Sequence, residues 1–206
     1  MSVTHDSSHA PAFPIGQQLL RLCLKEVFVF RVMQSDPNWS NFLYNPSTGK
    51  LVILDFGASR DYDKKFVDVY IRLIHAAAEG NRDGILEYSQ KLGFLTGYET
   101  KVMVDAHVDA VSILGEAFSS IKPFDFGRQS TTRRLNRLIP IMMEHRLTPP
   151  PDESYSLHRK LSGCFLLCGK LRAVVECRPL FYDIFNSYTF DTPETEVDAT
   201  TLSRST

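Results

Sequence analysis

Residues 34–57, which read QSDPNWSNFLYNPSTGKLVILDFG, contain the most informative pattern of this chain. In it, Asp36 is followed five residues later by Asn41, and an Asp-Phe-Gly tripeptide begins fourteen residues further on at Asp55. Between Asn41 and Asp55, two apolar runs flank an Asn-Pro-Ser-Thr-Gly turn. Such a pattern predicts a β-hairpin. We therefore expect the hairpin to bring Asn41 and Asp55 side by side.

These residue types suit magnesium-dependent phosphoryl transfer. That reaction needs oxygen ligands that hold Mg²⁺ against the phosphates of ATP, and a carboxylate near the attacking hydroxyl. Asp55 would be the principal Mg²⁺ ligand and Asn41 the second, so both would hold the Mg²⁺-ATP cofactor. Asp36 is left to orient the nucleophile. The spacing is typical of kinase catalytic and metal-binding loops, and a solvated loop with capping side chains is the alternative.

A second Asp-Phe-Gly, at residues 125–127, shows how little the tripeptide means alone. It has no apolar strand before it and no Asp/Asn pair at the right distance, so we predict a loop there. At the first copy, by contrast, the Asp/Asn spacing, the hairpin and the apolar strand agree.

Further segments match one known family in order along the chain: FLTGYE (94–99), ILGEAF (113–118), PFDFG (123–127) and PPPDESYSLHRK (149–160). Together with residues 34–57, they make the chain similar to the UbiB (aarF-domain) atypical kinases, in the animal mitochondrial branch. The resemblance implies a mainly α-helical fold, the carboxyl-terminal (large) lobe of a protein-kinase-like domain, in which a small β-hairpin carries the catalytic and metal loops. It places Asp36 as the catalytic Asp, and Asn41 and Asp55 as the Mg²⁺ and ATP ligands.

The resemblance also implies a function. The family supports ubiquinone (coenzyme Q) biosynthesis in mitochondria and behaves as an ATPase more than as an ordinary protein kinase. Expected partners are ATP, other ubiquinone-biosynthesis proteins or a full-length paralogue. One departure from the pattern of ordinary protein kinases agrees with ATPase behaviour. Asn38 lies two residues after Asp36, where many Ser/Thr kinases have a lysine. Without that cation, part of the stabilisation of transition-state charge is missing.

The segment before Asp36 lacks other parts of a kinase site. A phosphate-covering loop, a strand lysine and a helix glutamate paired to it should all precede the catalytic loop. Only 35 residues precede Asp36, and their one lysine, Lys25, lies in an apolar stretch at 19–33 that predicts a helix. We therefore expect a large lobe alone, with weak or no activity.

Domain boundaries follow from the resemblance and from composition. Residues 1–14 have no match, lack the features of a mitochondrial presequence and are expected to be disordered. Residues 15–188 would form the kinase-like lobe, and residues 189–206, rich in Thr, Ser, Asp and Glu, a disordered tail. Helical periodicity predicts helices at 64–78, 98–118, 131–145 and 154–171, and a further one from a cap near Asn81 to Leu92.

Composition narrows the partners. A net charge of −1 with both signs scattered provides no basic field for nucleic acid. No run of eighteen apolar residues exists to span a membrane, which leaves only peripheral membrane contact open. The four cysteines lack the paired spacing of a zinc site, so buried thiols are expected, with redox sensing as the alternative.

Three functional interpretations stay open: part of an ATP-dependent UbiB-type enzyme, a non-catalytic interaction module, or an incomplete gene model that lacks the small lobe. Because a small lobe normally covers part of the large one, we also expect an exposed apolar patch near the catalytic loop and a tendency to self-associate.

Overall fold

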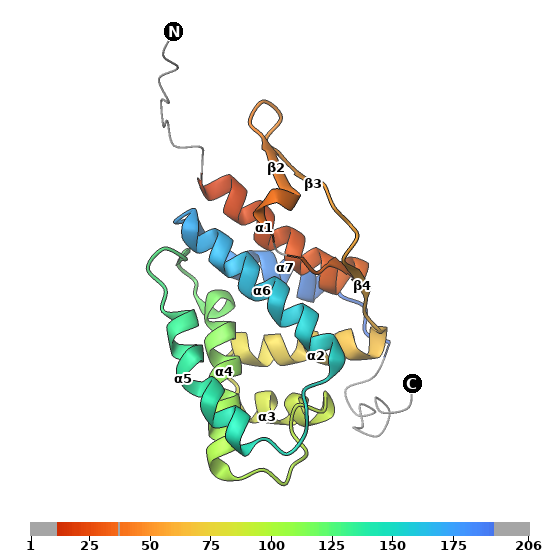
Figure 1. Cartoon of the computed structure of the whole chain (residues 1–206), viewed down its shortest axis with the longest axis vertical. Helices are drawn as coiled ribbons and strands as arrows, with labels where there is room; N and C mark the ends of the chain where they lie inside the picture. Colours follow the sequence, from red (N-terminus) through yellow and green to blue (C-terminus); the bar gives the residue numbers. More distant parts are fainter. Residues whose placement is uncertain (1–11, 37, 192–206) are drawn as a thin grey trace.

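The computed structural model describes residues 12–36 and 38–191, and that part of the chain is mainly helical (Figure 1). The helices are α1 Ala12–Lys25, α2 Lys64–Ala78, α3 Arg82–Lys91, α4 Lys101–Ser119, α5 Thr131–His145, α6 Asp152–Lys170 and α7 Cys177–Ser187. The strands are β1 Val32–Gln34, β2 Phe42–Asn45, β3 Lys50–Ile53, β4 Ser59–Asp61, β5 Phe124–Asp125 and β6 Val174–Val175. They pair antiparallel as β1 with β4, β2 with β3 and β5 with β6.

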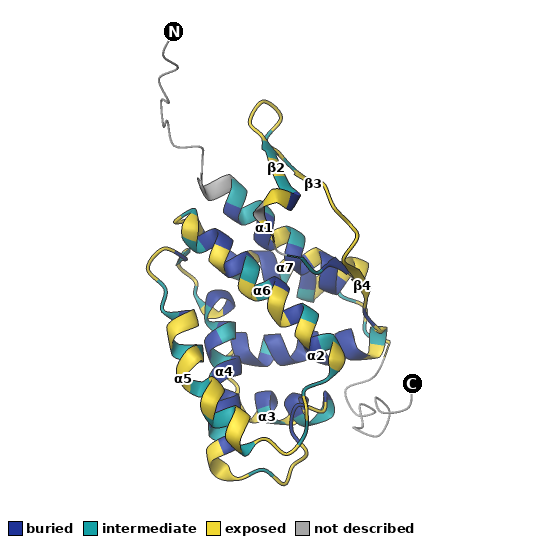
Figure 2. Cartoon of the chain, viewed as in Figure 1, coloured by how far each residue is buried: buried dark blue, intermediate teal, exposed yellow. Residues whose placement is uncertain are grey.

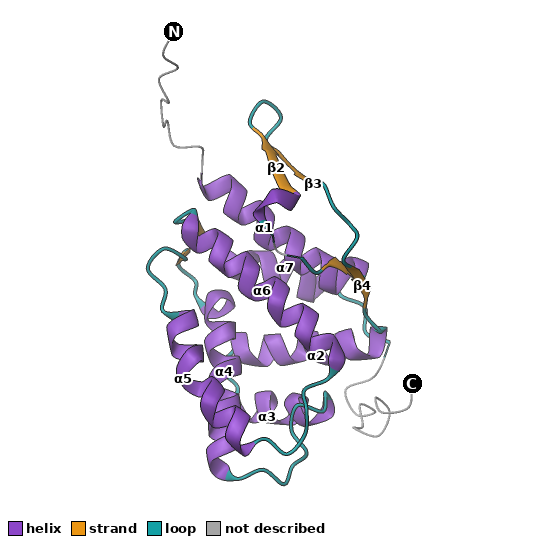
Figure 3. Cartoon of the chain, viewed as in Figure 1, coloured by secondary structure: helices purple, strands orange, loops and turns teal. Residues whose placement is uncertain are grey.

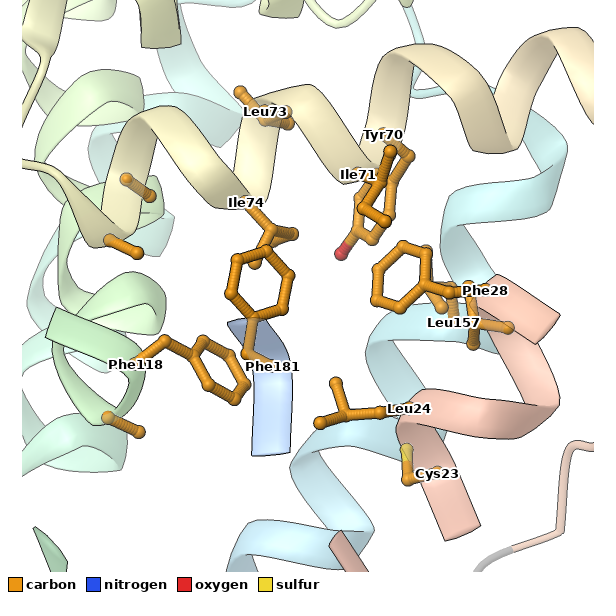
Figure 4. Packing of buried hydrophobic residues seen from close by; sticks show 14 of the residues in the cluster. Cys23, Leu24, Phe28, Tyr70, Ile71, Leu73, Ile74, Phe118, Leu157 and Phe181 are labelled. Atoms are coloured by element: carbon orange, nitrogen blue, oxygen red, sulfur yellow. The ribbon is translucent and has the colours of Figure 1, made fainter. Parts of the chain in front are cut away.

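Helix α2 lies at the centre of the fold. Twelve of its fifteen residues are buried, which is typical of a helix packed on all sides (Figure 2). Its Tyr70 stacks on Phe28 with ring centroids 6.1 Å apart, and Phe28 in turn meets Phe181 of α7 edge-on at 6.3 Å. Figure 4 shows Leu157 of α6 and Phe118 of α4 completing this cluster. The core therefore joins segments from both ends of the chain.

Local signals explain where helices α2 and α3 begin. The Asp63 side chain accepts a hydrogen bond from the Lys65 N–H at 2.7 Å and caps α2, and Asn81 caps α3 by accepting from the Gly84 N–H at 2.9 Å. The predicted cap at Asn81 is confirmed. So are the predicted helices at 64–78 and 131–145, with the same bounds as α2 and α5.

The predicted helix over 19–33 is wrong in its second half. Helix α1 ends at Lys25, a π-helical turn follows at Glu26–Phe30, and Arg31 adopts a left-handed φ of 56° before β1 begins. Valine and phenylalanine alternate in this turn, and such residues are weak helix formers. Pairing with β4 then satisfies the backbone of β1, so tertiary context overrides the apolar pattern.

Two other predictions need correction at the ends of the described chain. Residues 12–14 belong to α1 instead of a disordered terminus, and 189–191 pack on α2 instead of starting a disordered tail. The Asp191 N–H donates to the Asp68 carboxylate at 3.0 Å, and the Arg72 guanidinium lies 4.0 Å from the centroid of the Phe190 ring. The predictions of disorder at 1–11 and 192–206 lie outside the described residues.

All four cysteines are buried and unpaired, as predicted. Within residues 12–36 and 38–191, none of the helices combines the length and apolar character needed to cross a membrane.

Candidate active site

Two small sheets hold the predicted catalytic and metal loops together. Segment 35–41 connects β1 to β2, and segment 54–58 connects β3 to β4 (Figure 3). Because β1 pairs with β4 and β2 with β3, each loop is fixed at both of its ends to the other. The Ser35 N–H donates to the Ala58 carbonyl at 2.9 Å at one end. At the other end, the Leu54 N–H donates to the Asn41 carbonyl at 3.0 Å.

The structure brings Asp36 and Asn41 into contact. The Asn41 Nδ2 donates to the Asp36 Oδ2 at 2.9 Å, and Asn41 is only 8% exposed. The backbone between them is compact: the Asn38 N–H donates to Asp36 Oδ1 at 3.3 Å, and the Asn41 N–H donates to the Asn38 carbonyl at 3.0 Å. This arrangement directs the amide nitrogen of Asn41 at Asp36, so its Oδ1 is the atom suited to a metal ion.

Asp55 lies at the same end of the hairpin as Asn41, as predicted, because it directly follows Leu54. Its carboxylate is exposed and accepts a hydrogen bond from the Gly57 N–H at 2.8 Å. Among the described residues, no hydrogen bond joins the Asp55 side chain to Asp36 or Asn41. The loop therefore presents Asp55 at the same end of the hairpin as the Asp36–Asn41 pair, without a hydrogen bond to either residue.

The donor set suits a hard cation. The Asp55 carboxylate and the Asn41 amide oxygen are ligands that Mg²⁺ accepts, provided that water and phosphate oxygens complete the shell. The described residues hold no group of three or more His, Cys, Asp or Glu side chains arranged to bind a metal by themselves. Mg²⁺ held by Asn41 and Asp55 would thus depend on a nucleotide and water for its remaining ligands.

The second Asp-Phe-Gly forms the same turn in a different setting. Asp125 accepts a hydrogen bond from the Gly127 N–H at 2.9 Å, as Asp55 does from Gly57. Phe126 is buried, 2% exposed, whereas Phe56 is 60% exposed. The loop prediction was wrong for Asp125 itself, which pairs in β5 with β6. This copy packs the core, since Phe126 meets Phe165 edge-on at 5.2 Å.

Sequence reasoning missed a buried ion pair directly behind the catalytic loop. Lys160 of α6 and Glu26 of the π-helical turn are 3% and 5% exposed, and Lys160 Nζ lies 3.1 Å from Glu26 Oε2. Burial raises the pKa of Glu26 above its usual range, and the Lys160 ammonium opposes that rise. A signal existed, because Lys160 falls between Leu157 and Cys164 on the buried stripe of α6.

Exposed apolar side chains surround the site, as predicted. Leu43, Leu54 and Phe56 are 54%, 53% and 60% exposed, and all three lie on the hairpin or on the loop after it. Others nearby are Val29, Phe30, Val32 and Val52. These seven exposed residues lie on the loop of Asp55 or on the elements before and after the loops of Asp36 and Asp55, and we call them the apolar patch.

A helical lobe whose paired loops present an Asp, an Asn and an Asp-Phe-Gly defines a kinase-like domain. Residues 4–89 match the ABC1 atypical kinase-like domain, and this segment contains Asp36, Asn41 and Asp55. The match begins eleven residues before the predicted start at residue 15. The chain belongs to this family of atypical kinases.

Its similarity to characterised relatives extends over most of the chain and points to the COQ8 branch. It is 59% identical to the mitochondrial atypical kinase COQ8B of Danio rerio over 170 residues, which are 82% of this chain and 27% of that protein. It is 56% identical to the mitochondrial atypical kinase coq-8 of Caenorhabditis elegans over 85% of this chain and 24% of that protein. It is 49% identical to the mitochondrial atypical kinase COQ8 of Saccharomyces cerevisiae over 83% of this chain and 34% of that protein. The chain thus spans between a quarter and a third of the length of these relatives, and their names agree with the predicted mitochondrial location.

A solved structure supports the fold. The complex of Rv3197 with erythromycin from Mycobacterium tuberculosis superposes with a TM-score of 0.64 at 21% identity, covering 91% of this chain and 46% of that one. The predicted kinase-like, mainly helical fold is therefore confirmed.

Proposed function

We propose that this chain carries the metal-binding half of an ATP-dependent atypical kinase site that supports ubiquinone biosynthesis in mitochondria. In this proposal, Asp55 and Asn41 hold Mg²⁺-ATP, and Asp36 orients the attacking nucleophile. The observation that carries it is the hydrogen bond of 2.9 Å between Asn41 and Asp36, in a loop paired at both ends with the loop of Asp55. Membership of the COQ8 branch supports it.

The chemistry of each residue follows from its surroundings. Bound Mg²⁺ would neutralise charge on the phosphates. The Asn41 amide fixes the Asp36 carboxylate through one oxygen, which sets the direction in which it accepts a proton or orients water. Asn38, the residue at the position of a kinase lysine, brings no cation, which favours an ATPase over a protein kinase. Asp55 is exposed, so its electrostatic interactions are screened by water and we expect slow turnover from this chain by itself.

The apolar patch favours a second candidate function, a non-catalytic interaction module. More than half of the Leu43, Leu54 and Phe56 surface is exposed beside the site. Exposed apolar surface, where it is contiguous, often marks an interface with another protein. Candidate partners are ubiquinone-biosynthesis proteins or a full-length paralogue, and binding to them would not need ATP turnover.

Thermal unfolding with and without Mg²⁺-ATP tests the proposal. A ligand at about a hundred times its Kd adds about 2.7 kcal/mol, which raises the Tm of a chain of this size by about 5–10 °C. We expect this rise in the wild-type chain, its loss in Asp55→Ala and in excess chelator, and its retention in the matched control Asp125→Ala. Asp125 belongs to the other Asp-Phe-Gly and forms the same turn.

Two results would contradict the proposal. One is a wild-type Tm that does not respond to Mg²⁺-ATP, which would favour the interaction module. The other is an equal rise in Asp55→Ala, which would mean that the nucleotide binds elsewhere.

A further inference from the structure

The buried ammonium of Lys160 contacts the residues on either side of the catalytic loop. On one side, its Nζ donates to the backbone carbonyl of Gln34 at 2.7 Å and approaches the Gln34 Oε1 at 3.3 Å. On the other side, it lies 5.4 Å from the centroid of the Phe42 ring, within the range of a cation–π interaction. Gln34 is two residues before Asp36, and Phe42 directly follows Asn41. One cation therefore bridges both ends of the loop.

Glu26 completes the arrangement from the opposite direction. Its Oε1 accepts a hydrogen bond from the Gln34 N–H at 3.2 Å, and its Oε2 lies 3.1 Å from Lys160 Nζ. The ion pair thus holds both the N–H and the carbonyl of Gln34. The π-helical turn begins at Glu26 and closes with the Arg31 N–H bonded to the Glu26 carbonyl, so an unusual backbone places this carboxylate. Such turns frequently occur at functional sites.

Stability alone does not account for this pair. Removing two charges from water costs about as much as their attraction returns, and well-packed apolar residues often stabilise a core equally well. A buried ion pair does impose one geometry on the groups bonded to it, because any displaced partner would leave a charge buried and unpaired. Here those groups are the backbone of Gln34 and the ring of Phe42.

We infer that Lys160 and Glu26 are positioning residues that fix the conformation of the segment 35–41 and, with it, the placement of Asp36 and Asn41. They touch no reacting group themselves. The catalytic consequence rests on the proposed function, whereas the effect on the loop does not. Lys160 belongs to α6, far along the chain, so the catalytic loop is held by an element that sequence proximity would not suggest.

The test uses Lys160→Met and the double variant Glu26→Gln/Lys160→Met, which removes both charges and spares the core an unpaired carboxylate. A control, Ile85→Ala, removes buried volume from α3, at the opposite end of the molecule from the hairpin (Figure 1). Hydrogen exchange of the Ser35, Asn41 and Leu54 amides reports on the loop, since each donates a hydrogen bond there. The fluorescence of Trp39 adds a second reporter, because it is the only tryptophan of the sequence and belongs to the loop.

We expect the three loop amides to exchange at least about tenfold faster in both Lys160 variants, a factor equivalent to about 1.4 kcal/mol. The fluorescence emission of Trp39 should differ from that of the wild type as well. In Ile85→Ala, compared at equal distance below its own Tm, both readouts should match the wild type. Unchanged loop exchange in the Lys160 variants would overturn the inference. Loss of folded structure in both variants would also overturn it, because the pair would then act on the whole fold.

The same variants separate this inference from the proposed function. A loosened loop in the variants, together with a wild-type Tm that ignores Mg²⁺-ATP, would refute nucleotide binding and still support positioning by Lys160 and Glu26. If the wild-type Tm responds to Mg²⁺-ATP and the loop is unchanged in the variants, nucleotide binding is supported and positioning by Lys160 and Glu26 is refuted.

Discussion

Acid should destabilise this fold through His107. The imidazole of His107, on α4, is only 8% exposed, and its Nε2 forms a hydrogen bond of 2.9 Å with the Ser89 hydroxyl of α3. The Phe94 ring covers it with centroids 5.6 Å apart. Burial lowers the pKa of His107 to about 4, His158 adds to this effect and Glu99 opposes it. The ring is therefore neutral in the fold at physiological pH.

The sign and size of the effect follow from linkage. An unfolded histidine has a pKa of about 6.5, so between this value and about 4 the unfolded chain binds a proton that the folded chain excludes. Stability from the neutral ring is complete above pH 6.5 and is lost as the pH falls through this window. The gap between 6.5 and about 4 corresponds to about 3 kcal/mol of unfolding free energy.

Urea denaturation of the wild-type chain and of His107→Gln, at intervals from pH 7.5 to 4.5, measures this contribution. Glutamine does not titrate and can still form a hydrogen bond with Ser89. The carboxylates are the same in both proteins, so their contribution to the pH dependence cancels in the difference between the two stability curves. We expect the variant to lose less stability on acidification, by up to about 3 kcal/mol. Parallel curves would refute the reasoning, since His107 would then titrate alike in both states.

Two further predictions concern packing and the apolar patch. In Gly115→Ala, the new Cβ would lie 2.5 Å from the Ala77 Cβ and 2.7 Å from its carbonyl carbon, so we expect a loss of about 1–3 kcal/mol in urea denaturation; equal or higher stability would show that α2 and α4 can separate freely. Phe56→Ser should reduce concentration-dependent association in sedimentation velocity, while Tyr98→Ser, which removes an 89% exposed ring elsewhere, should not. A wild-type chain that stays monomeric at high concentration would contradict the second prediction.

Local patterns were enough to predict the hairpin between Asn41 and Asp55. Two short apolar runs flank a turn there, and such local pairing depends little on the rest of the fold. The same holds for α2 and α5, whose periodicity extends over fifteen residues each. The roles of Asp36, Asn41 and Asp55 stay predictions, although the hydrogen bond between Asp36 and Asn41 agrees with them.

Helix α7 and the Lys160–Glu26 ion pair could not be predicted from the sequence, because both depend on contacts between residues far apart in the chain. Helix α7 was not predicted because it is short and rich in aromatic residues, which are weak helix formers. Tertiary packing stabilises it, since its Phe181 contacts the rings of Phe28 and Phe118. The pairing of Lys160 with Glu26 joins residues from opposite ends of the chain, and each was hidden in an apolar helical pattern.

The nested pairing of the two small sheets, with β2–β3 enclosed between β1 and β4 along the chain, has a consequence for how the site is lost. Neither the loop of Asp36 nor that of Asp55 can leave its place without breaking a strand pair to which the other loop is also attached. We therefore expect the two loops to open together, as one cooperative unit. A molecule that retains the geometry of Asp36 but has lost that of Asp55 should be scarce, so chemical or thermal stress would divide the population into intact and fully opened sites.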